Sequence, residues 1–201
     1  MKKRSKKRRM ISARTKKSLI YSSIIVGVIL ASLLIAVGVN ALIVAFEKND
    51  CPHPYSDLVS NYAEKYDVPE NLIYAVIRVE SNFKADALSS KGARGLMQIM
   101  PIAYEDYCYY TGEDFDVSLL SDPETNISVG AYLLARLYRH YGNWDTVLAA
   151  YNAGIGTVNE WLEDERYSSG DGILTDIPYP ETRSYVEKVN RYKSVYDMLY
   201  D

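Results

Sequence analysis

The longest apolar stretch of the chain lies near its N-terminus. Residues 19–46 contain no charged side chain. At about 1.5 Å of rise per residue, a helix of this length exceeds the ~20 residues that are needed to cross a bilayer. The pattern therefore predicts one N-terminal transmembrane helix over residues 19–46.

Beyond residue 46 the apolar residues recur at the spacing of three and four that is typical of helices packed on one side. No alternating strand pattern of useful length is present in the sequence. The expected helices cover residues 55–66, 69–80, 96–104 with a break or kink at Pro101, 123 to a stop at Gly142, 144–152, a short segment to about 162, and 181–200. The sequence thus predicts a mostly α-helical domain over residues 56–201, joined to the membrane helix by an extracellular linker over residues 47–55.

The flanks of the apolar stretch differ strongly in charge. Ten Lys and Arg and no acidic residue fall within residues 1–17, whereas only Lys48 follows the stretch closely. The positive-inside rule then places a basic tail, residues 1–18, in the cytoplasm and the rest of the chain outside the cell membrane, facing the wall. The alternative is a cleavable signal peptide cut after Ala41 or Ala45, whose apolar region is usually only about 7 to 15 residues long.

The remainder of the chain is acidic. Residues 47–201 carry 13 of the 23 Lys and Arg and all 26 Asp and Glu, a net charge of 13 − 26 = −13. Such a domain is not expected to bind nucleic acid. Cys51 and Cys108 both follow the membrane helix, where an oxidising exterior permits a disulfide, and the sequence leaves open whether they are bridged or separate thiols.

The helix predicted over residues 69–80 ends on an acid. The spacing of Leu72, Ile73, Val76 and Ile77 continues to Glu80 and places it on the buried stripe. Desolvation would raise the pKa of such a carboxyl group towards the range that a general acid needs near neutrality. Glu80 is therefore a candidate catalytic acid, and the alternative is a helix-end glutamate that turns to solvent.

Four stretches of sequence carry a resemblance to a known family. They are Glu80-Ser81, then Gly-Ala-Arg-Gly-Leu-Met-Gln-Ile-Met-Pro at 92–101, Ala-Ala-Tyr-Asn-Ala-Gly at 149–154 and Glu-Thr-Arg-Ser-Tyr-Val at 181–186. In this order and spacing they closely resemble the motifs of the soluble lytic transglycosylase catalytic domain, which has a lysozyme-like fold related to goose-type lysozyme. The resemblance spans about residues 55–200. Ile155 stands where many members of the family carry proline.

The resemblance implies a peptidoglycan lytic transglycosylase. Such an enzyme cleaves the β-1,4 bond between N-acetylmuramic acid and N-acetylglucosamine and forms a 1,6-anhydromuramyl product. Glu80 matches the family's single catalytic acid, which also acts as the base. The implied reaction requires neither a metal nor a cofactor, and its partners are peptidoglycan strands and the membrane. Further partners in cell-envelope machinery would be unidentified.

The resemblance also assigns roles to the other motif residues. Substrate contact falls to Ser89, Met97, Gln98, Tyr151 and Asn152, and support of the site to Ser81, Gly92, Gly95, Glu181 and Tyr185. For Glu181 we favour a buried hydrogen-bond partner that organises the cleft. The residue types alone are also compatible with loop hydrogen bonding by Ser89, core packing by Met97 and a helix-dipole role for Glu181.

Two alternatives to a transglycosylase remain at the level of sequence. A hydrolytic muramidase of the lysozyme type needs a second carboxylate opposite the acid, and the sequence does not tell which of Asp86, Glu105, Asp106, Asp145 or Glu181 lies there. A non-catalytic peptidoglycan-binding or assembly module would share the fold without turnover. The presence of both Glu80 and Tyr151 favours an enzyme.

Overall fold

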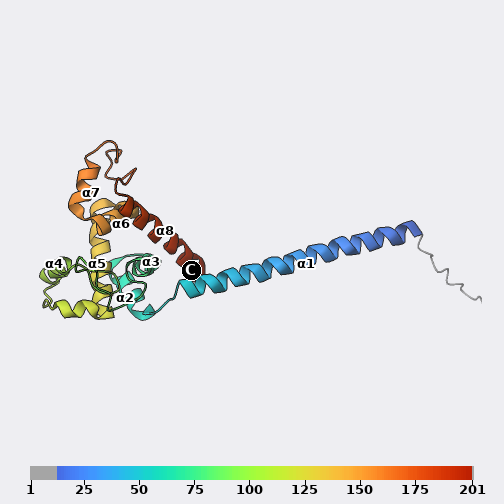
Figure 1. Ribbon diagram of the computed structural model, residues 1–201, viewed down its shortest axis with the longest axis horizontal. Coiled ribbons are helices and arrows are strands. Elements are labelled where there is room, and N and C mark those ends of the chain that lie inside the picture. Colours follow the sequence, from blue (N-terminus) through green and yellow to red (C-terminus); the bar gives the residue numbers. More distant parts are fainter. Residues whose placement is uncertain (1–12, 201) are drawn as a thin grey trace, which may run out of the picture. The chain divides into compact units, whose positions relative to one another are not determined.

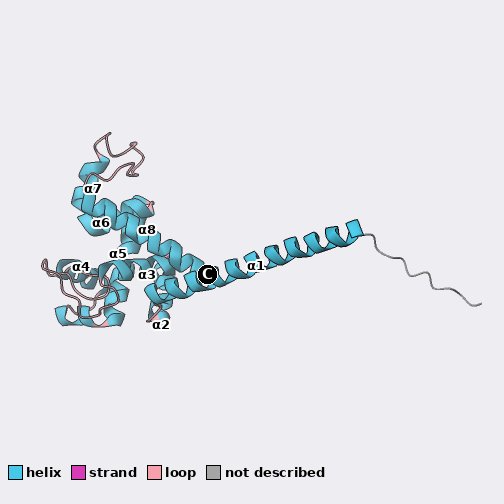
Figure 2. Cartoon of the chain, turned by 45° about the vertical axis from the view of Figure 1, so that its right-hand side comes forward, coloured by secondary structure: helices cyan, strands magenta, loops and turns pink. Residues whose placement is uncertain are grey.

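The computed structural model describes residues 13–200 (Figure 1). The chain divides into two units, Met1–Asp50 and Cys51–Asp201. Helices account for most of the described residues, and Figure 2 shows no strand among them. The prediction of a mostly helical chain is confirmed.

The first unit consists of one long helix, α1 (Ala13–Asp50). Its segment Ile20–Asp50 has a mean hydropathy of 2.7, and none of it is buried within the protein. Apolar side chains are exposed along its whole length, among them Leu34, Leu42 and Phe46. A helix that is apolar on all sides is suited to lipid rather than to water. Helix α1 is therefore long and apolar enough to cross a membrane, and it contains the whole predicted span.

The second unit packs its helices around one apolar core. Along the chain these are α2 (Ser56–Tyr66), α3 (Glu70–Glu80), α4 (Pro101–Thr111), the 3₁₀ helix η1 (Val117–Ser121), α5 (Pro123–Tyr141), α6 (Trp144–Ala153), α7 (Ile155–Leu162) and α8 (Pro180–Tyr200). Helix α3 is buried over most of its length and packs against α8, and α5 packs against α2 and α6. The active-site candidates of α3, α6 and α8 therefore come from adjoining helices.

Local sequence explains where α5 and α6 begin. The Asp122 side chain accepts a hydrogen bond from the amide of Thr125 at 2.9 Å, and Pro123 takes the first helical position. Asn143 caps α6 in the same way, with its side chain 3.0 Å from the amide of Thr146. Such caps pair amides that a helix start otherwise leaves without a partner. Helix α5 thus begins at Pro123, as the sequence predicts.

The helix predicted over residues 96–104 is wrong for its first half. The backbone of Gly95 and Gln98 is left-handed, with φ of 77° and 49°, and the amide and carbonyl groups of Arg94 and Ile99 pair with each other at 2.9 and 3.0 Å. A helix begins only at Pro101, which occupies the first turn of α4 instead of kinking it. Leu96, Met97 and Ile99 are buried in this compact turn, and their spacing in the sequence resembles that of a helix.

The predicted linker is only partly a linker. Residues 47–50 continue α1, and the second unit starts at Cys51. Residues 51–54, which we call the clamped segment, are held by three tyrosine hydroxyls. Those of Tyr200, Tyr196 and Tyr74 donate to the carbonyl oxygens of Cys51, Pro52 and Pro54 at 2.9, 2.9 and 3.2 Å.

We call the clamped segment together with the three tyrosines that hold it the clamp. Aromatic stacking also contributes to it. The His53 ring lies between the rings of Tyr74 and Tyr200, with centroid distances of 4.0 and 4.3 Å. Cys51 is fully buried. Cys108 is also buried, with its thiol directed at the carbonyl of Asp114 at 3.7 Å, and no disulfide joins the two cysteines.

Candidate active site

Glu80 is the last residue of α3 and is only partly exposed. Burial raises the pKa of its carboxyl group from 4.5 to about 7, and the neighbouring Tyr185 hydroxyl opposes this rise. The position at the negative end of a helix dipole acts in the same direction as burial. A carboxyl group with this pKa can exist in both protonation states near neutral pH, as the sequence predicts for Glu80.

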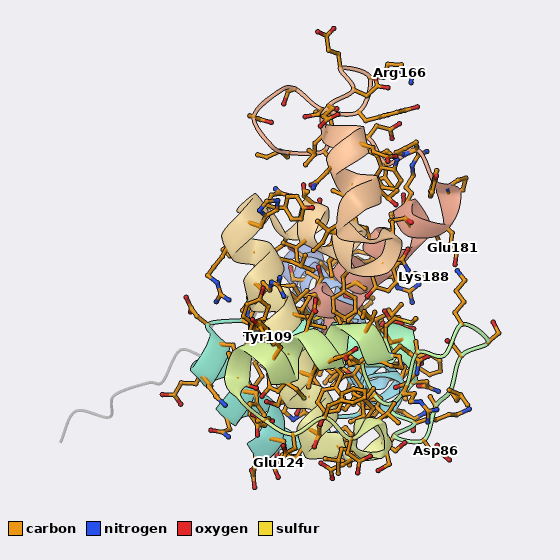
Figure 3. All side chains as sticks on the ribbon, turned by 90° about the vertical axis from the view of Figure 1, so that its left-hand side faces the viewer. Asp86, Tyr109, Glu124, Arg166, Glu181 and Lys188 are labelled. Atoms are coloured by element: carbon orange, nitrogen blue, oxygen red, sulfur yellow. The ribbon has the colours of Figure 1, made fainter. Side chains whose placement is uncertain are left out.

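No second carboxylate of the described residues contributes to the raised pKa of Glu80. The five acids considered from the sequence are all exposed, namely Asp86, Glu105, Asp106, Asp145 and Glu181. In Figure 3 Asp86 and Glu181 lie on separate parts of the unit, in the loop after α3 and at the start of α8. A nearby like charge would raise the pKa further. Burial, and not a neighbouring acid, therefore accounts for the raised pKa of Glu80.

Two tyrosines accompany Glu80. The Tyr151 hydroxyl, from α6, donates to the carbonyl of Met97 at 2.8 Å. The Tyr185 hydroxyl, from α8, is buried and makes no hydrogen bond of regular geometry to a described residue, although it interacts with the Glu80 carboxyl group. Burial and the adjacent Glu80 raise the pKa of both hydroxyls well above the usual 10. Both therefore remain protonated at neutral pH.

The loop before α4 brings Gln98 to the site. Its side-chain amide donates to the carbonyls of Ala87 and Gly95 at 3.2 and 2.9 Å. Its left-handed backbone, at φ 49°, is uncommon for a residue with a side chain and is typical of functional sites. Gly92 also has a positive φ, 90°. Gly92 and Gly95 thus both adopt a backbone conformation that favours glycine.

Gly95 is confined by space as well as by conformation. A Cβ atom there would collide with the side chain of Asn126 and the carbonyl of Leu120. Gly95 therefore allows its loop to lie directly against Asn126 of α5. The side chain of Asn126 also accepts a hydrogen bond from the amide of Met97 at 2.7 Å. Asn126 therefore holds the turn around Met97 in place.

Two predicted roles need correction. The Met97 side chain is completely buried and lies against Gly130, so it belongs to the core, and only its carbonyl reaches Tyr151. Glu181 is exposed in the first turn of α8, where an acid complements the helix dipole, and is not a buried partner of the site. A match to a family motif does not tell whether a side chain is buried, so the sequence could not distinguish these roles.

The remaining candidates have clear structural contacts. Ser89 accepts hydrogen bonds from the amides of Lys91 and Ala93 at 3.3 and 2.9 Å and so shapes its own loop. Ser81 is buried and donates to the carbonyl of Ile77 at 3.3 Å. Asn152 is exposed and accepts from the Thr182 hydroxyl at 2.9 Å, which ties α6 to α8.

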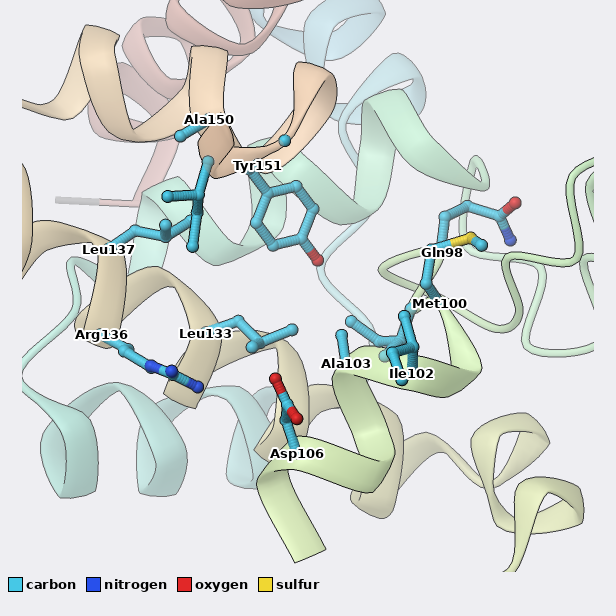
Figure 4. Close-up of a pocket in the computed structure, with 13 residues that line it drawn as sticks. Gln98, Met100, Ile102, Ala103, Asp106, Leu133, Arg136, Leu137, Ala150 and Tyr151 are labelled. Atoms are coloured by element: carbon cyan, nitrogen blue, oxygen red, sulfur yellow. The ribbon is translucent and has the colours of Figure 1, made fainter. Parts of the chain in front are cut away.

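Gln98 and Tyr151 line a pocket of about 310 Å³ (Figure 4). We call it the apolar pocket, because most of its other lining residues are apolar: Ile99, Met100, Ile102, Ala103, Leu133, Leu137, Ala150 and Ile155, together with Gly154. Asp106 and Arg136 contribute the charged groups. The sequence analysis missed most of these residues. They come from four separate helices and the loop before α4, and nothing in their local spacing connects them.

Comparison with known proteins gives a consistent result. Residues 57–172 match the model of the family described as Transglycosylase SLT domain. The soluble lytic murein transglycosylase of Escherichia coli K12 is 36% identical over 156 residues, which cover 72% of this chain and 23% of that protein. Membrane-bound lytic murein transglycosylase C of Serratia proteamaculans is 33% identical over 167 residues, with 72% and 47% covered.

A solved structure agrees with these similarities. An inactive mutant of lytic transglycosylase Slt from Pseudomonas aeruginosa, with a glutamate replaced by glutamine, superposes with a TM-score of 0.67 at 34% identity. The match covers 74% of this chain and 24% of that one. The chain thus spans about a quarter of the soluble relatives and about half of the membrane-bound one. The lysozyme-like helical fold expected from the motifs is confirmed.

Proposed function

Because the chain belongs to the transglycosylase SLT domain family, we propose that its second unit is a peptidoglycan lytic transglycosylase. It cleaves the β-1,4 bond between N-acetylmuramic acid and N-acetylglucosamine. The observation that carries this proposal is the half-buried Glu80, whose pKa is raised to about 7 without any contribution from a second acid. A hydrolytic glycosidase of the usual kind needs two carboxylates.

Glu80 acts in both halves of the reaction. Its protonated carboxyl group gives a proton to the glycosidic oxygen while the bond from that oxygen to C1 of the muramyl residue breaks. The resulting carboxylate takes the proton of the muramyl 6-hydroxyl while O6 bonds to C1. The proton count on Glu80 is restored, no water is consumed, and the product is a 1,6-anhydro ring.

The tyrosines serve this cycle in different ways. The Tyr185 hydroxyl interacts with Glu80 and lowers its pKa, so it stabilises the carboxylate that exists between the two proton transfers. Tyr151 fixes the turn at Met97 and, with Gln98, lines the apolar pocket where the glycan binds. The exposed amide of Asn152 and the hydroxyl of Ser89 are additional candidate contacts for the sugar.

The proposal extends to the location of the enzyme. Helix α1 crosses the cell membrane once, with the basic tail in the cytoplasm and the second unit outside, facing the wall. The charge difference across α1, its hydropathy and the membrane-bound relative support this arrangement. External protease added to intact cells should cut the second unit, and protection of that unit would refute the orientation.

The decisive experiment is mass analysis of the muropeptides released when the full chain, in detergent, acts on peptidoglycan. Muramyl ends one water lighter than hydrolysed ends are expected from the wild type. The Glu80→Gln variant should be slower by about 10² to 10⁴-fold, because it lacks the general acid and base. Glu187→Gln, which changes an exposed acid of α8, should retain activity.

Two other results would contradict the proposal. Reducing muramyl ends would show a hydrolytic muramidase that uses water. An absence of products from every wall preparation, with retained binding, would show a binding or assembly module.

A further inference from the structure

One amide side chain interrupts the apolar surface of α1. Asn40 lies within the uncharged stretch of residues 19–46, and α1 runs through it as one continuous helix (Figure 1). The middle of that stretch falls at residues 32–33, so Asn40 lies about 11 Å from it along the helix axis. Half of a bilayer's hydrocarbon core is about 15 Å thick. Where α1 crosses the membrane as proposed, the Asn40 amide therefore lies in hydrocarbon.

The Asn40 side chain also lacks a partner on its own helix. The hydroxyls of Ser22 and Ser32 donate to the carbonyls of Ser18 and Ile29 at 3.0 and 2.8 Å. Asn40 is exposed, and its side-chain amide makes no hydrogen bond to a described residue. An amide that is transferred to hydrocarbon without a hydrogen bond lowers stability. These two serines are thus satisfied within α1, whereas Asn40 requires a group from outside it.

A second copy of the chain supplies that group. The side chain of asparagine carries both a donor and an acceptor, so two asparagines can each donate to the other's carbonyl oxygen. Two copies that are inserted in the same orientation hold Asn40 at the same depth, because the same flanking residues set the position of α1. Hydrogen bonds between such side chains hold membrane helices together. A helix of another protein would need its own polar group at this depth.

The surface around Asn40 suits close pairing of two helices. Steps of three and four residues through Asn40 define what we call the Asn40 face, which is exposed throughout and consists of Val26, Ile29, Leu33, Ala36, Asn40 and Ile43. This is the spacing at which helices wind around each other, and one asparagine in such a seam fixes its register. The small Ala36, one turn before Asn40, lets two backbones approach closely. Nearly every other residue of the span is apolar, so Asn40 is what singles out this face.

We propose that α1 pairs in parallel with α1 of a second copy through the Asn40 face, with the two Asn40 amides hydrogen-bonded to each other. This inference rests on the proposed crossing of the membrane by α1 and is independent of the chemistry at Glu80. Each pair then carries two second units on the same side of the membrane. The membrane helix acts as an assembly element as well as an anchor.

The opposite side of α1 offers a competing surface. Ser23, Gly27 and Ala31 follow one another at intervals of four residues, a stripe of small side chains that can also bring helices together. Ala31 and Asn40 are nine residues apart, which places them about 180° apart around the helix. Pairing through the stripe would leave Asn40 facing lipid, so the two arrangements can be distinguished experimentally.

The first test is disulfide cross-linking of the full chain in membranes. In a parallel pair, identical residues of the seam meet, so Ala36→Cys should give a cross-linked dimer when an oxidant is added. Ala31→Cys is the matched control, because it makes the same substitution on the opposite side of α1. It should give no more dimer than the parent chain, whose Cys51 and Cys108 are buried and set the background.

The second test is sedimentation equilibrium of the full chain in detergent micelles. Asn40→Leu should raise the dissociation constant of the pair about tenfold, because two hydrogen bonds between the helices are lost. Asn40→Gln keeps the amide and should retain most of the affinity. Leu33→Ala should weaken the pair, and Leu34→Ala, the same change one residue away and off the seam, should not.

The outcomes leave no overlap with the proposed function. A chain that stays monomeric at every concentration, or an Asn40→Leu variant that pairs as tightly as the wild type, would overturn the pairing. Cross-linking through Ala31→Cys in place of Ala36→Cys would also overturn it, in favour of the small-residue stripe. None of these results changes the muropeptides that the wild type and Glu80→Gln release, and an absence of muropeptides would leave the cross-linking pattern unaffected.

Discussion

Two groups of tyrosines in the second unit have different surroundings. In the clamp, the hydroxyls of Tyr74, Tyr196 and Tyr200 each donate to a backbone carbonyl of residues 51–54. At the site, Tyr151 is paired in the same manner, but the buried hydroxyl of Tyr185 faces Glu80 without a regular hydrogen bond. The fully buried Tyr74 and Tyr196 have paired hydroxyls, whereas the buried Tyr185 does not, so hydrogen-bond pairing is what differs.

The difference separates a structural role from a chemical one. A buried polar group without a partner lowers the stability of the fold, whereas a paired one contributes to it. The clamp therefore has the pattern of a region that serves stability. The site keeps an incompletely paired donor next to an acid whose charge changes during the proposed reaction. Such a donor is at its strongest when the carboxylate forms.

The largest effect that would test this comparison is on stability at high pH. The pKa of Glu80 is higher in the folded state, about 7, than its ordinary 4.5, so its contribution to stability is present below pH 4.5 and is lost as the pH rises through 7. At pH 8 the Glu80→Gln variant should be more stable than the wild type by on the order of 3 kcal/mol. Chemical denaturation of the full chain at pH 4 and pH 8 measures this difference.

At pH 4 the two proteins should have nearly the same free energy of unfolding. Glu187→Gln, an exposed change, should follow the wild type at both values. A difference between Glu80→Gln and wild type that does not vary with pH would mean that burial of the charge is not what distinguishes this site.

Tyr185→Phe should have the next largest effect, and it should appear in activity. The variant removes the hydroxyl that lowers the pKa of Glu80, so the alkaline limb of the pH–rate profile should move to higher pH. Turnover at the optimum should fall on the order of tenfold, as the carboxylate loses a donor. The free energy of unfolding should change by less than about 1 kcal/mol, because no regular hydrogen bond is lost. A large loss of stability with an unmoved profile would make Tyr185 an ordinary core residue.

The smallest effect is expected at the clamp. Tyr196→Phe removes the donor to the Pro52 carbonyl and should lower the free energy of unfolding by about 1 kcal/mol, while the pH–rate profile stays in place. Tyr109→Phe, at a side chain that is 82% exposed, should leave both quantities unchanged. A shifted pH profile in Tyr196→Phe would erase the distinction between the two groups.

Local signals in the sequence were sufficient for much of the fold. Helical spacing correctly located α3 and put Glu80 on its buried side, and Asp122 and Pro123 marked the start of α5. These features depend on residues within one or two turns of each other. The role of Glu80 as the acid nevertheless stays a prediction that the Glu80→Gln experiment must test.

The errors concern features that depend on distant residues. Leu96 to Met100 looks helical, but Asn126 of α5 pairs with the amide of Met97 and a left-handed Gln98 forms the turn. The clamped segment resembles a linker because the tyrosines that hold it come mainly from α8, at the other end of the chain. The apolar pocket likewise exists only after α4, α5, α6 and α7 have packed.

The clamp also has a mechanical consequence. Helix α1 ends at Asp50, and the next residue, Cys51, is fully buried in the second unit. A pull along α1 is transmitted first through the carbonyls of Cys51 and Pro52 to Tyr196 and Tyr200, and these lie on α8. The same helix carries Tyr185 beside the acid. If α1 spans the membrane as proposed, tension on it would therefore load α8, the helix that also holds Tyr185.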